Sequence, residues 1–248
     1  MEKKETFKYG LLGKDIDYSF SRGYFAKKFE HEQLKNHHYE NFDCTDVKEI
    51  EQTLKRTDLC GMNVTIPYKE TVLSLMDTLD KEAEEIGAVN TILFKKNGQL
   101  VGHNTDAYGF EKALFDQFDI SPNRALILGT GGASKAIEYV LKKRGILPQF
   151  VSRKSSEKAI SYDQLNSEII NTHLLIINCS PLGTFPNIEQ APKINYSAIT
   201  SQHVLFDLIY NPSETTFMKR GKKQGARVAN GMQMLIHQAE RSWALWNQ

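Results

Sequence analysis

The sequence predicts an α/β protein with two domains, and three observations support this class. Short apolar runs alternate with amphipathic segments along the chain, which is typical of strands alternating with helices. After Asp106 these runs become almost continuously apolar, as expected for a parallel sheet that is covered on both faces. One of them leads through a glycine-rich turn into a helical pattern. We therefore expect an α/β domain followed by a doubly wound parallel sheet.

Composition narrows the function classes. The chain has 248 residues, a net charge of +1 and 25% charged residues. It contains no basic stripe or arm of the kind that binds nucleic acid. It has no apolar run of the roughly 20 residues that span a bilayer, and the start "MEKKETFKYG" lacks the apolar region of a signal peptide. The cysteines Cys44, Cys60 and Cys179 lack metal-ligand spacing. We expect a cytoplasmic protein with reduced thiols, no metal and no membrane contact.

The first half of the chain alternates strand and helix patterns. Strands are predicted at 7–12, 37–44 and 61–67, and helices within 19–34, 45–57 and 68–87. The helix at 45–57 opens with a capping pattern, in which Thr45 or Asp46 is the N-cap and Glu49 lies close to the third helical position. Residues 88–105 form two β-rich runs around Asn97-Gly98, which predicts a hairpin.

The second half repeats the alternation with more apolar strands. The segment 106–118 is predicted as a helix, and 124–145 as a buried strand, a glycine turn and a helix. Further strands are expected within 147–154, 172–181 and 203–210, with helical or loop segments between them, and a last amphipathic helix covers 230–246.

The glycine turn "LGTGGAS" predicts a nucleotide site. Gly129, Gly131, Gly132 and Ala133 lie where a strand turns into a helix. Glycine permits a tight turn and a close backbone approach to a pyrophosphate, and the helix N-terminus attracts its charge. The strand before it and the helix after it are the context that supports this interpretation. A glycine turn without a ligand is the alternative.

The end of the next strand indicates the type of dinucleotide. An Asp or Glu there would hold the ribose 2′-hydroxyl of NAD, whereas an Arg suits the 2′-phosphate of NADP. This chain has Ser152, Arg153 and Lys154, and no carboxylate before Glu157. The cations favour NADP. The alternative is that Arg153 is a solvated loop charge.

Lys69 and Asp106 are candidates for acid–base chemistry. A dehydrogenase transfers a hydride to a carbonyl and needs a proton donor for the carbonyl oxygen. A lysine beside a carboxylate suits that role. Spacing alone does not place the two side chains together, and a single lysine or aspartate is more often a surface charge.

The chain resembles the shikimate dehydrogenase family over nearly its whole length. The motifs that carry the resemblance occur in the family's order: "YGLLGKDIDYSFS", "NVTIPYK", "IGAVNT", "GHNTDAYG", "LGTGGAS", "NCSPLGT", "DLIYNP" and "NGMQMLIHQA". Within the family, Arg22 stands where proline is usual, Thr184 where methionine is usual, and Glu157 where a second arginine is frequent. Arg22 bears on the entry to the first helix but leaves the hydroxyls of Ser19 and Ser21, and Glu157 bears on the preference for NADP.

The resemblance implies a fold, a reaction and a set of site residues. It implies a substrate and catalytic domain at 1–105 plus 231–248 and a Rossmann-type NADP-binding domain at 106–230, so that the last helix returns to the first domain. The implied reaction is the reversible NADP-dependent reduction of 3-dehydroshikimate to shikimate in the shikimate pathway, by a monomer or homodimer with a small-molecule substrate. The implied acid–base pair is Lys69 and Asp106. The substrate residues are Ser19, Ser21, Thr65, Asn90, Tyr210 and Gln238, and the cofactor residues are Gly129, Gly131, Gly132, Ala133, Ser152, Arg153, Lys154, Ser180, Leu182, Gly231 and Met234.

Three alternatives remain at this point. The chain could be a broader quinate/shikimate dehydrogenase that uses NAD, against which Ser19, Ser21 and Arg153 argue. It could be a non-catalytic nucleotide-binding paralogue, although Lys69 and Asp106 are retained. It could be an amino-acid or methylene-folate dehydrogenase of the same two-domain plan, against which the density of substrate motifs argues.

Overall fold

The computed structural model describes residues 6–17 and 19–248. The chain forms two compact units: unit 1 comprises Met1–Thr105 and Ala239–Gln248, and unit 2 comprises Asp106–Gln238. Unit 2 thus begins at the residue where the sequence pattern changes. The division assigns residues 231–238 to unit 2, whereas the sequence analysis assigns them to the first domain. Residues 1–5 of that predicted domain, and Tyr18, lie outside the described residues.

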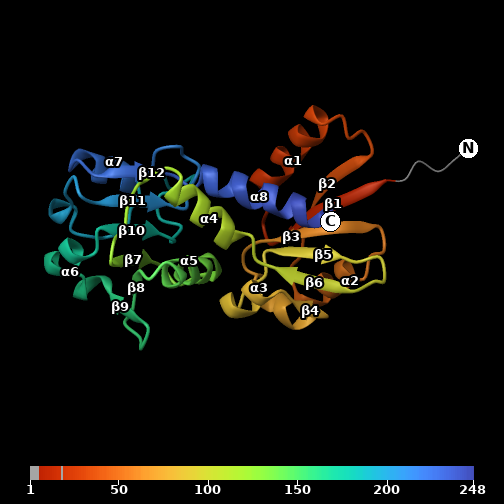
Figure 1. The fold of residues 1–248 in the computed structure, drawn as a ribbon, viewed down its shortest axis with the longest axis horizontal. Coiled ribbons are helices and arrows are strands. Elements are labelled where there is room, and N and C mark those ends of the chain that lie inside the picture. The colour runs from red at the N-terminus through yellow and green to blue at the C-terminus, as the bar shows by residue number, and fades with distance from the viewer. Residues whose placement is uncertain (1–5, 18) are drawn as a thin grey trace, which may run out of the picture. The chain divides into compact units, whose positions relative to one another are not determined.

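Unit 1 contains a six-stranded mixed sheet (Figure 1), with the order β2-β1-β3-β5-β6-β4. The strands are β1 (Phe7–Gly13), β2 (His37–Asp43), β3 (Leu59–Val64), β4 (Thr78–Leu79), β5 (Thr91–Phe94) and β6 (Leu100–His103). Strand β1 pairs in parallel with β2 and β3, whereas β5 is antiparallel to both β3 and β6. The predicted strands at 7–12 and 37–44 and the hairpin around Asn97-Gly98 are confirmed. The strand predicted at 61–67 is observed at 59–64, and residues 65–67 belong to the turn that follows it.

The helices of unit 1 are α1 (Phe20–His31), α2 (Val47–Leu54), the 3-10 helix η1 (Thr71–Leu75), α3 (Lys81–Ile86) and the last turns of α8 (Met232–Trp246). Short polar side chains cap the N-termini of α1, α2 and α3, whereas η1 has no side-chain cap. Asp46 is the N-cap of α2 and accepts a hydrogen bond from the Glu49 amide at 3.0 Å. The Glu49 carboxylate accepts from the Thr45 amide at 2.6 Å. Asp46, rather than Thr45, is therefore the cap.

The prediction of one helical segment over 68–87 was wrong. The structure has η1, then β4, then α3 in that interval. The Asp77 amide donates to the Leu100 carbonyl, and the Asp77 carboxylate accepts from the Leu100 amide. These bonds draw the chain into a short pairing with β6, and Asp80 then restarts the helix by accepting from the Ala83 amide. Pairing with a distant strand thus overrides the local helical pattern.

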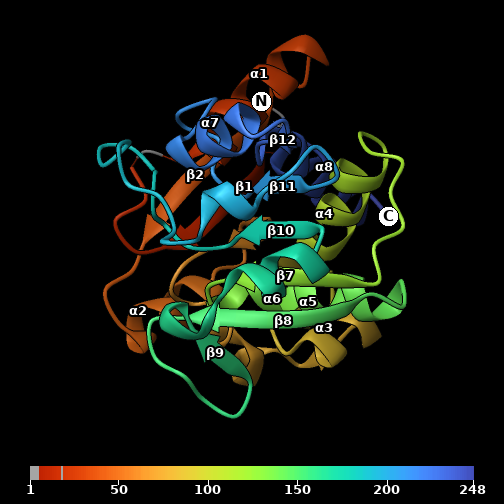
Figure 2. The same ribbon diagram turned by 90° about the vertical axis from the view of Figure 1, so that its left-hand side faces the viewer.

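Unit 2 contains six parallel strands in the order β12-β11-β10-β7-β8-β9 (Figure 2). The strands are β7 (Arg124–Leu128), β8 (Leu147–Ser152), β9 (Ala159–Ser161), β10 (Leu175–Asn178), β11 (Val204–Asp207) and β12 (Arg227–Ala229). In chain order this is the 3-2-1-4-5-6 arrangement of a doubly wound sheet, and β7 and β10 flank the point where the winding reverses. The predicted fold class is confirmed.

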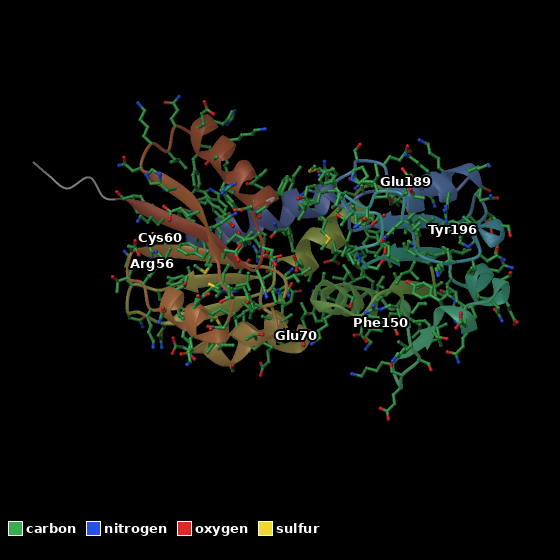
Figure 3. All side chains as sticks on the ribbon, turned by 180° about the vertical axis from the view of Figure 1, so that it is seen from behind. Arg56, Cys60, Glu70, Phe150, Glu189 and Tyr196 are labelled. Atoms are coloured by element: carbon green, nitrogen blue, oxygen red, sulfur yellow. The ribbon has the colours of Figure 1, made fainter. Side chains whose placement is uncertain are left out.

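Helices and buried strands supply the core of unit 2. Its helices are α4 (Asp106–Phe115), α5 (Gly132–Lys143), α6 (Ser167–Thr172), α7 (Thr216–Lys223), the 3-10 helices η2 (Tyr162–Gln164) and η3 (Tyr196–Ala198), and the first turns of α8. The central strands β7, β10 and β11 are buried along almost their whole length, which explains their apolar sequences. Phe150 of β8 and Tyr196 of η3 both belong to this unit (Figure 3).

Membrane spans and metal centres are both absent from the described part of the chain. Within the described residues, 6–17 and 19–248, no helix is long and apolar enough to cross a membrane. No group of three or more His, Cys, Asp or Glu side chains among the same residues could hold a metal ion.

Candidate active site

The predicted carboxylate-binding serines lie at the start of α1. Ser19 is the N-cap, and its hydroxyl accepts a hydrogen bond from the Ser21 amide at 3.2 Å. Ser21 is buried, and its side chain is hydrogen-bonded to the Tyr39 hydroxyl. The capping alternative therefore holds for Ser19, but a hydroxyl that accepts from an amide keeps its proton for a ligand.

Lys69 lies in a tight turn that follows β3, and its neighbours brace that turn. The Tyr68 amide donates to the Thr65 carbonyl at 2.9 Å, and the buried Tyr68 hydroxyl donates to the Cys44 carbonyl at 2.6 Å. The Lys69 carbonyl accepts from the Val89 amide at 2.8 Å. The turn thus holds the Lys69 backbone between two parts of the core of unit 1, which limits where the half-buried side chain can reach.

Asn90 lies inside a buried polar network rather than at the surface. Its Oδ1 accepts from the Thr105 amide at 2.7 Å and from the Thr91 hydroxyl at 3.1 Å, and its Nδ2 donates to the Thr105 hydroxyl at 3.0 Å. Asn90, Thr91 and Thr105 are at most 2% exposed. Such a network fixes the orientation of the Asn90 amide because each of its members has partners.

The network continues to β2, β3 and α8. The Tyr39 hydroxyl donates to Asn63 Oδ1 at 2.8 Å, and Asn63 Nδ2 donates to the Ser242 hydroxyl at 2.9 Å. Ser242 is in turn 2.8 Å from the Thr91 hydroxyl and 3.1 Å from the Thr105 hydroxyl. One buried set of hydrogen bonds therefore links Ser21, through Tyr39, with Asn90.

We expect Ser242→Ala to lower the free energy of unfolding of unit 1 by about 1–3 kcal/mol, because it leaves buried polar partners unpaired. Both tryptophans, Trp243 and Trp246, belong to unit 1, so urea unfolding followed by tryptophan fluorescence reports on this unit. The matched control is Ser74→Ala, since Ser74 is exposed and donates only a 3.3 Å bond to the Thr71 carbonyl. Equal effects of the two substitutions would contradict a stabilising network.

Asp106 and Gln238 are both buried and belong to unit 2. Asp106 is the first residue of α4, where a carboxylate interacts favourably with the positive end of the helix dipole. Gln238 lies on α8 and donates from Nε2 to the Leu235 carbonyl at 3.0 Å. Lys69 belongs to unit 1 and Asp106 to unit 2, so their pairing stays a prediction.

The glycine turn between β7 and α5 leaves space where a phosphate would approach. Gly129 has φ +114°, and a Cβ there would lie 3.2 Å from the Cys179 backbone. Gly131 is the N-cap of α5, and a Cβ there would meet nothing within 4 Å. Gly132 and Ala133 begin the helix. Gly129 is thus needed for the turn itself, whereas Gly131 keeps the helix N-terminus open.

The predicted adenosine-phosphate residues follow β8. The Ser152 hydroxyl donates to the Lys154 carbonyl, which folds the strand end into a compact turn. Arg153 and Lys154 are exposed, so both cations are available to a solvent-borne anion. The ends of β7 and β8 are neighbours in the sheet, which places this turn next to the glycine turn.

Polar side chains that the sequence analysis did not select lie at the ends of β10 and β11. Asn178 and Asp207 are fully buried and end these two strands. Asn178 Nδ2 donates to Asp207 Oδ1 at 3.0 Å, and Asn178 Oδ1 accepts from the Ser180 amide and hydroxyl at 3.0 and 2.6 Å. The signal that could have found them is a polar residue that ends an otherwise apolar strand, as in "LIIN" and "VLFD".

The remaining predicted cofactor residues lie after β10 and after β12. Leu182 follows Ser180 in the loop after β10, and its carbonyl accepts from Asn178 Nδ2 at 3.4 Å. The Gly231 amide donates to the Ile209 carbonyl at 3.0 Å, next to Tyr210. Met234 is buried in the first turn of α8. Each of these residues belongs to unit 2. Leu182 follows β10 in the chain, whereas Gly231 and Met234 follow β12, and the Gly231 amide reaches the loop after β11.

Comparisons with known proteins agree with the resemblance. The family model of the shikimate dehydrogenase substrate binding domain matches residues 11–92. A shikimate dehydrogenase (NADP(+)) of Methanococcus maripaludis is 36% identical over 99% of this chain and 94% of its own length. Two solved structures have a similar fold over nearly the whole chain. A shikimate dehydrogenase in complex with NADP+ has a TM-score of 0.89 at 30% identity, covering 99% of this chain and 91% of that one. The enzyme of Thermus thermophilus in complex with NADP(H) and shikimate has a TM-score of 0.86 at 29% identity, covering 97% and 93%. Because this identity of 36% extends over 99% of its residues, the chain belongs to the shikimate dehydrogenase family.

Proposed function

We propose that this chain is an NADP-dependent shikimate dehydrogenase that reversibly reduces 3-dehydroshikimate to shikimate, on the route to chorismate and the aromatic amino acids. The observation that carries the proposal is the 36% identity to a shikimate dehydrogenase (NADP(+)) over 99% of the chain. The open helix N-terminus at Gly131, beside the point where a doubly wound sheet reverses, supports the nucleotide half of the reaction.

In this proposal Lys69 and Asp106 form the acid–base pair. NADPH, when bound, supplies the hydride that reduces the C3 carbonyl. The Lys69 ammonium donates a proton to the carbonyl oxygen, which becomes the product hydroxyl, and Asp106 orients the ammonium. In the oxidation of shikimate, the neutral Lys69 amine takes the proton back. The braced turn that carries Lys69 supports this role, since a proton donor must be held within hydrogen-bonding reach.

The substrate side consists of neutral hydrogen-bonding groups. We assign the carboxylate to the hydroxyls of Ser19 and Ser21, and the ring hydroxyls to Thr65, Asn90 and Gln238, with Tyr210 beside the reacting carbon. A trihydroxy acid is polar all round, and a site of buried Ser, Thr, Asn and Gln side chains discriminates strongly because a wrong substrate leaves them unpaired. The burial of Ser21, Asn90 and Gln238 supports this assignment.

On the cofactor side, we assign three groups of residues. The pyrophosphate lies against the glycine turn, the 2′-phosphate against Arg153 and its neighbours, and the nicotinamide against residues that follow β10 and β12. The residues in order are Gly129, Gly131, Gly132 and Ala133; Ser152, Arg153 and Lys154; and Ser180, Leu182, Gly231 and Met234. The exposure of both cations after β8 supports NADP over NAD, because a guanidinium pairs with a phosphate.

The same proposal includes the organisation and setting of the chain. The substrate domain comprises 1–105 with 231–248, and the nucleotide domain comprises 106–230. A cytoplasmic location is supported by the three free thiols of Cys44, Cys60 and Cys179, because such compartments keep cysteines reduced. We propose a monomer or homodimer without nucleic acid.

The test is a crossed assay with the purified chain, followed at 340 nm. We expect rapid reduction of NADP+ with shikimate, and at least ten-fold lower kcat/KM with NAD+ or with quinate. Equal use of quinate or NAD+ would assign the chain to the broader quinate/shikimate branch. Shikimate binding without turnover for any pair would indicate a non-catalytic paralogue, and absence of binding would refute the site assignment.

A further inference from the structure

We propose that Asp207 is a positioning residue for the nicotinamide half of the cofactor. Its carboxylate joins the two loops that follow β10 and β11. This inference rests on the proposed function, because it concerns the same nucleotide site. Asp207 itself touches neither substrate nor cofactor. It acts through Asn178 and Ser180.

The Asp207 carboxylate is the centre of a buried hydrogen-bond cluster. Its Oδ1 accepts from Asn178 Nδ2 at 3.0 Å and from the Ile209 amide at 3.1 Å, and its Oδ2 accepts from the Thr215 hydroxyl at 2.6 Å. Asp207 and Thr215 are 0% exposed. A carboxylate accepts all three bonds without having to donate one, which an amide of the same shape cannot do.

The cluster reaches the glycine turn through Ser180. Asn178 holds the Ser180 amide and hydroxyl, and the Asn178 carbonyl accepts from the Leu208 amide at 3.0 Å. A Cβ on Gly129 would lie 3.2 Å from both the Cys179 backbone and the Ser180 amide, so the loop after β10 lies directly against the turn. Ligands of doubly wound sheets bind outside the carboxyl ends of the strands at the switch point. Asn178 ends β10, which flanks that point, and Asp207 ends the adjacent strand β11.

A buried, ionised carboxylate at position 207 lowers the stability of the fold, so packing alone does not explain why an acid is present there. Burial raises the pKa of Asp207 to about 6, although the bonds from Thr215, Ile209 and Asn178 oppose the shift. The neighbouring titratable groups are the Cys179 thiol and the Tyr196 hydroxyl, and burial raises the pKa of both. The Arg220 guanidinium lies over the Tyr196 ring at 5.3 Å. Because the folded-state pKa is raised, ionised Asp207 lowers stability increasingly from about pH 4 to about pH 6 and fully above that range. The cluster therefore stabilises a specific loop geometry at the expense of overall stability.

The test separates the two halves of the cofactor. The probes are NADPH and adenosine 2′,5′-bisphosphate, which lacks the nicotinamide, and their dissociation constants are measured by fluorescence and calorimetry at pH 7.5. We expect Asp207→Ala to weaken NADPH at least ten-fold and adenosine 2′,5′-bisphosphate less than two-fold. Asp207→Asn should restore most of the NADPH affinity, since its Oδ1 keeps the bonds from Asn178 and Ile209.

Two further variants make the result decisive. Val204→Ala removes buried methyl groups at the other end of β11, so it should lower stability without changing the ratio of the two affinities. Asn178→Ala breaks the link from Asp207 to Ser180 and should reproduce the selective loss even if Asp207→Ala fails to fold. An unchanged ratio in Asp207→Ala or in Asn178→Ala would overturn the inference while leaving the proposed function intact. A wild-type chain that binds neither probe would overturn the proposed function itself.

Discussion

Replacing Lys69 by alanine is expected to lower kcat for shikimate oxidation by about 1,000-fold, with KM changed by less than a factor of five. Positioned acid–base groups contribute about 10²- to 10⁴-fold to such rates, and removal of the proton acceptor affects the chemical step more than binding. The measurement is the rate of NADP+ reduction at 340 nm over a range of shikimate concentrations, with NADPH affinity determined in parallel.

The matched control for Lys69 is Lys81→Ala in the same unit. The Lys81 side chain is 88% exposed and lies 3.8 Å from Glu85, so its removal should leave kcat within a factor of two. Circular dichroism and the urea midpoint show whether either variant has lost structure. If Lys69→Ala keeps more than a tenth of the wild-type kcat, Lys69 is not the proton donor and the acid–base assignment must be abandoned.

Gly131→Val is expected to weaken NADPH binding by about 100-fold, which corresponds to about 2.7 kcal/mol. A Cβ at this position meets no protein atom within 4 Å, so the substitution should be tolerated by the fold. The isopropyl group would occupy the space at the N-terminus of α5 through which a pyrophosphate approaches the backbone amides. Isothermal calorimetry with NADPH measures the affinity, and thermal unfolding without ligand measures the stability.

Gly23→Ala serves as the comparison for Gly131. A Cβ on Gly23 also meets nothing within 4 Å, but Gly23 lies within α1 of unit 1. Its substitution should leave NADPH affinity unchanged and raise stability by about 0.5–1 kcal/mol, because alanine loses less backbone entropy in a helix. Wild-type NADPH affinity in Gly131→Val would show that the open space at this turn does not hold the cofactor.

Much of the fold could be predicted because its signals lie in adjacent residues. An apolar strand, Gly129 and the first turn of α5 follow one another in the chain, so the switch from strand to helix could be identified without tertiary information. The same holds for the hairpin around Asn97-Gly98 and for a helix start at Thr45 or Asp46, between which the structure decides for Asp46. In each case the backbone conformation depends on residues a few positions apart.

The interval 68–87 shows where local patterns are insufficient. Its apolar spacing favours one helix, yet Asp77 pairs with Leu100, which is 23 positions away. A sequence window short enough to predict a helix does not include Leu100, so it cannot account for the stabilisation that this pairing provides. Asp80 is the N-cap of α3, but in the sequence it could not be distinguished from the other acidic residues around it.

By itself, the sequence determined the α/β class, the glycine turn and the candidate residues that lie in motifs, because these depend on short-range order along the chain. Only the tertiary structure decided which side chains support them. Ser242 meets Asn63 across 179 positions, and Asp207 meets Asn178 across 29. The physical reason is that a buried polar group takes its partners from whichever strands and helices pack around it, and that packing is a property of the whole fold.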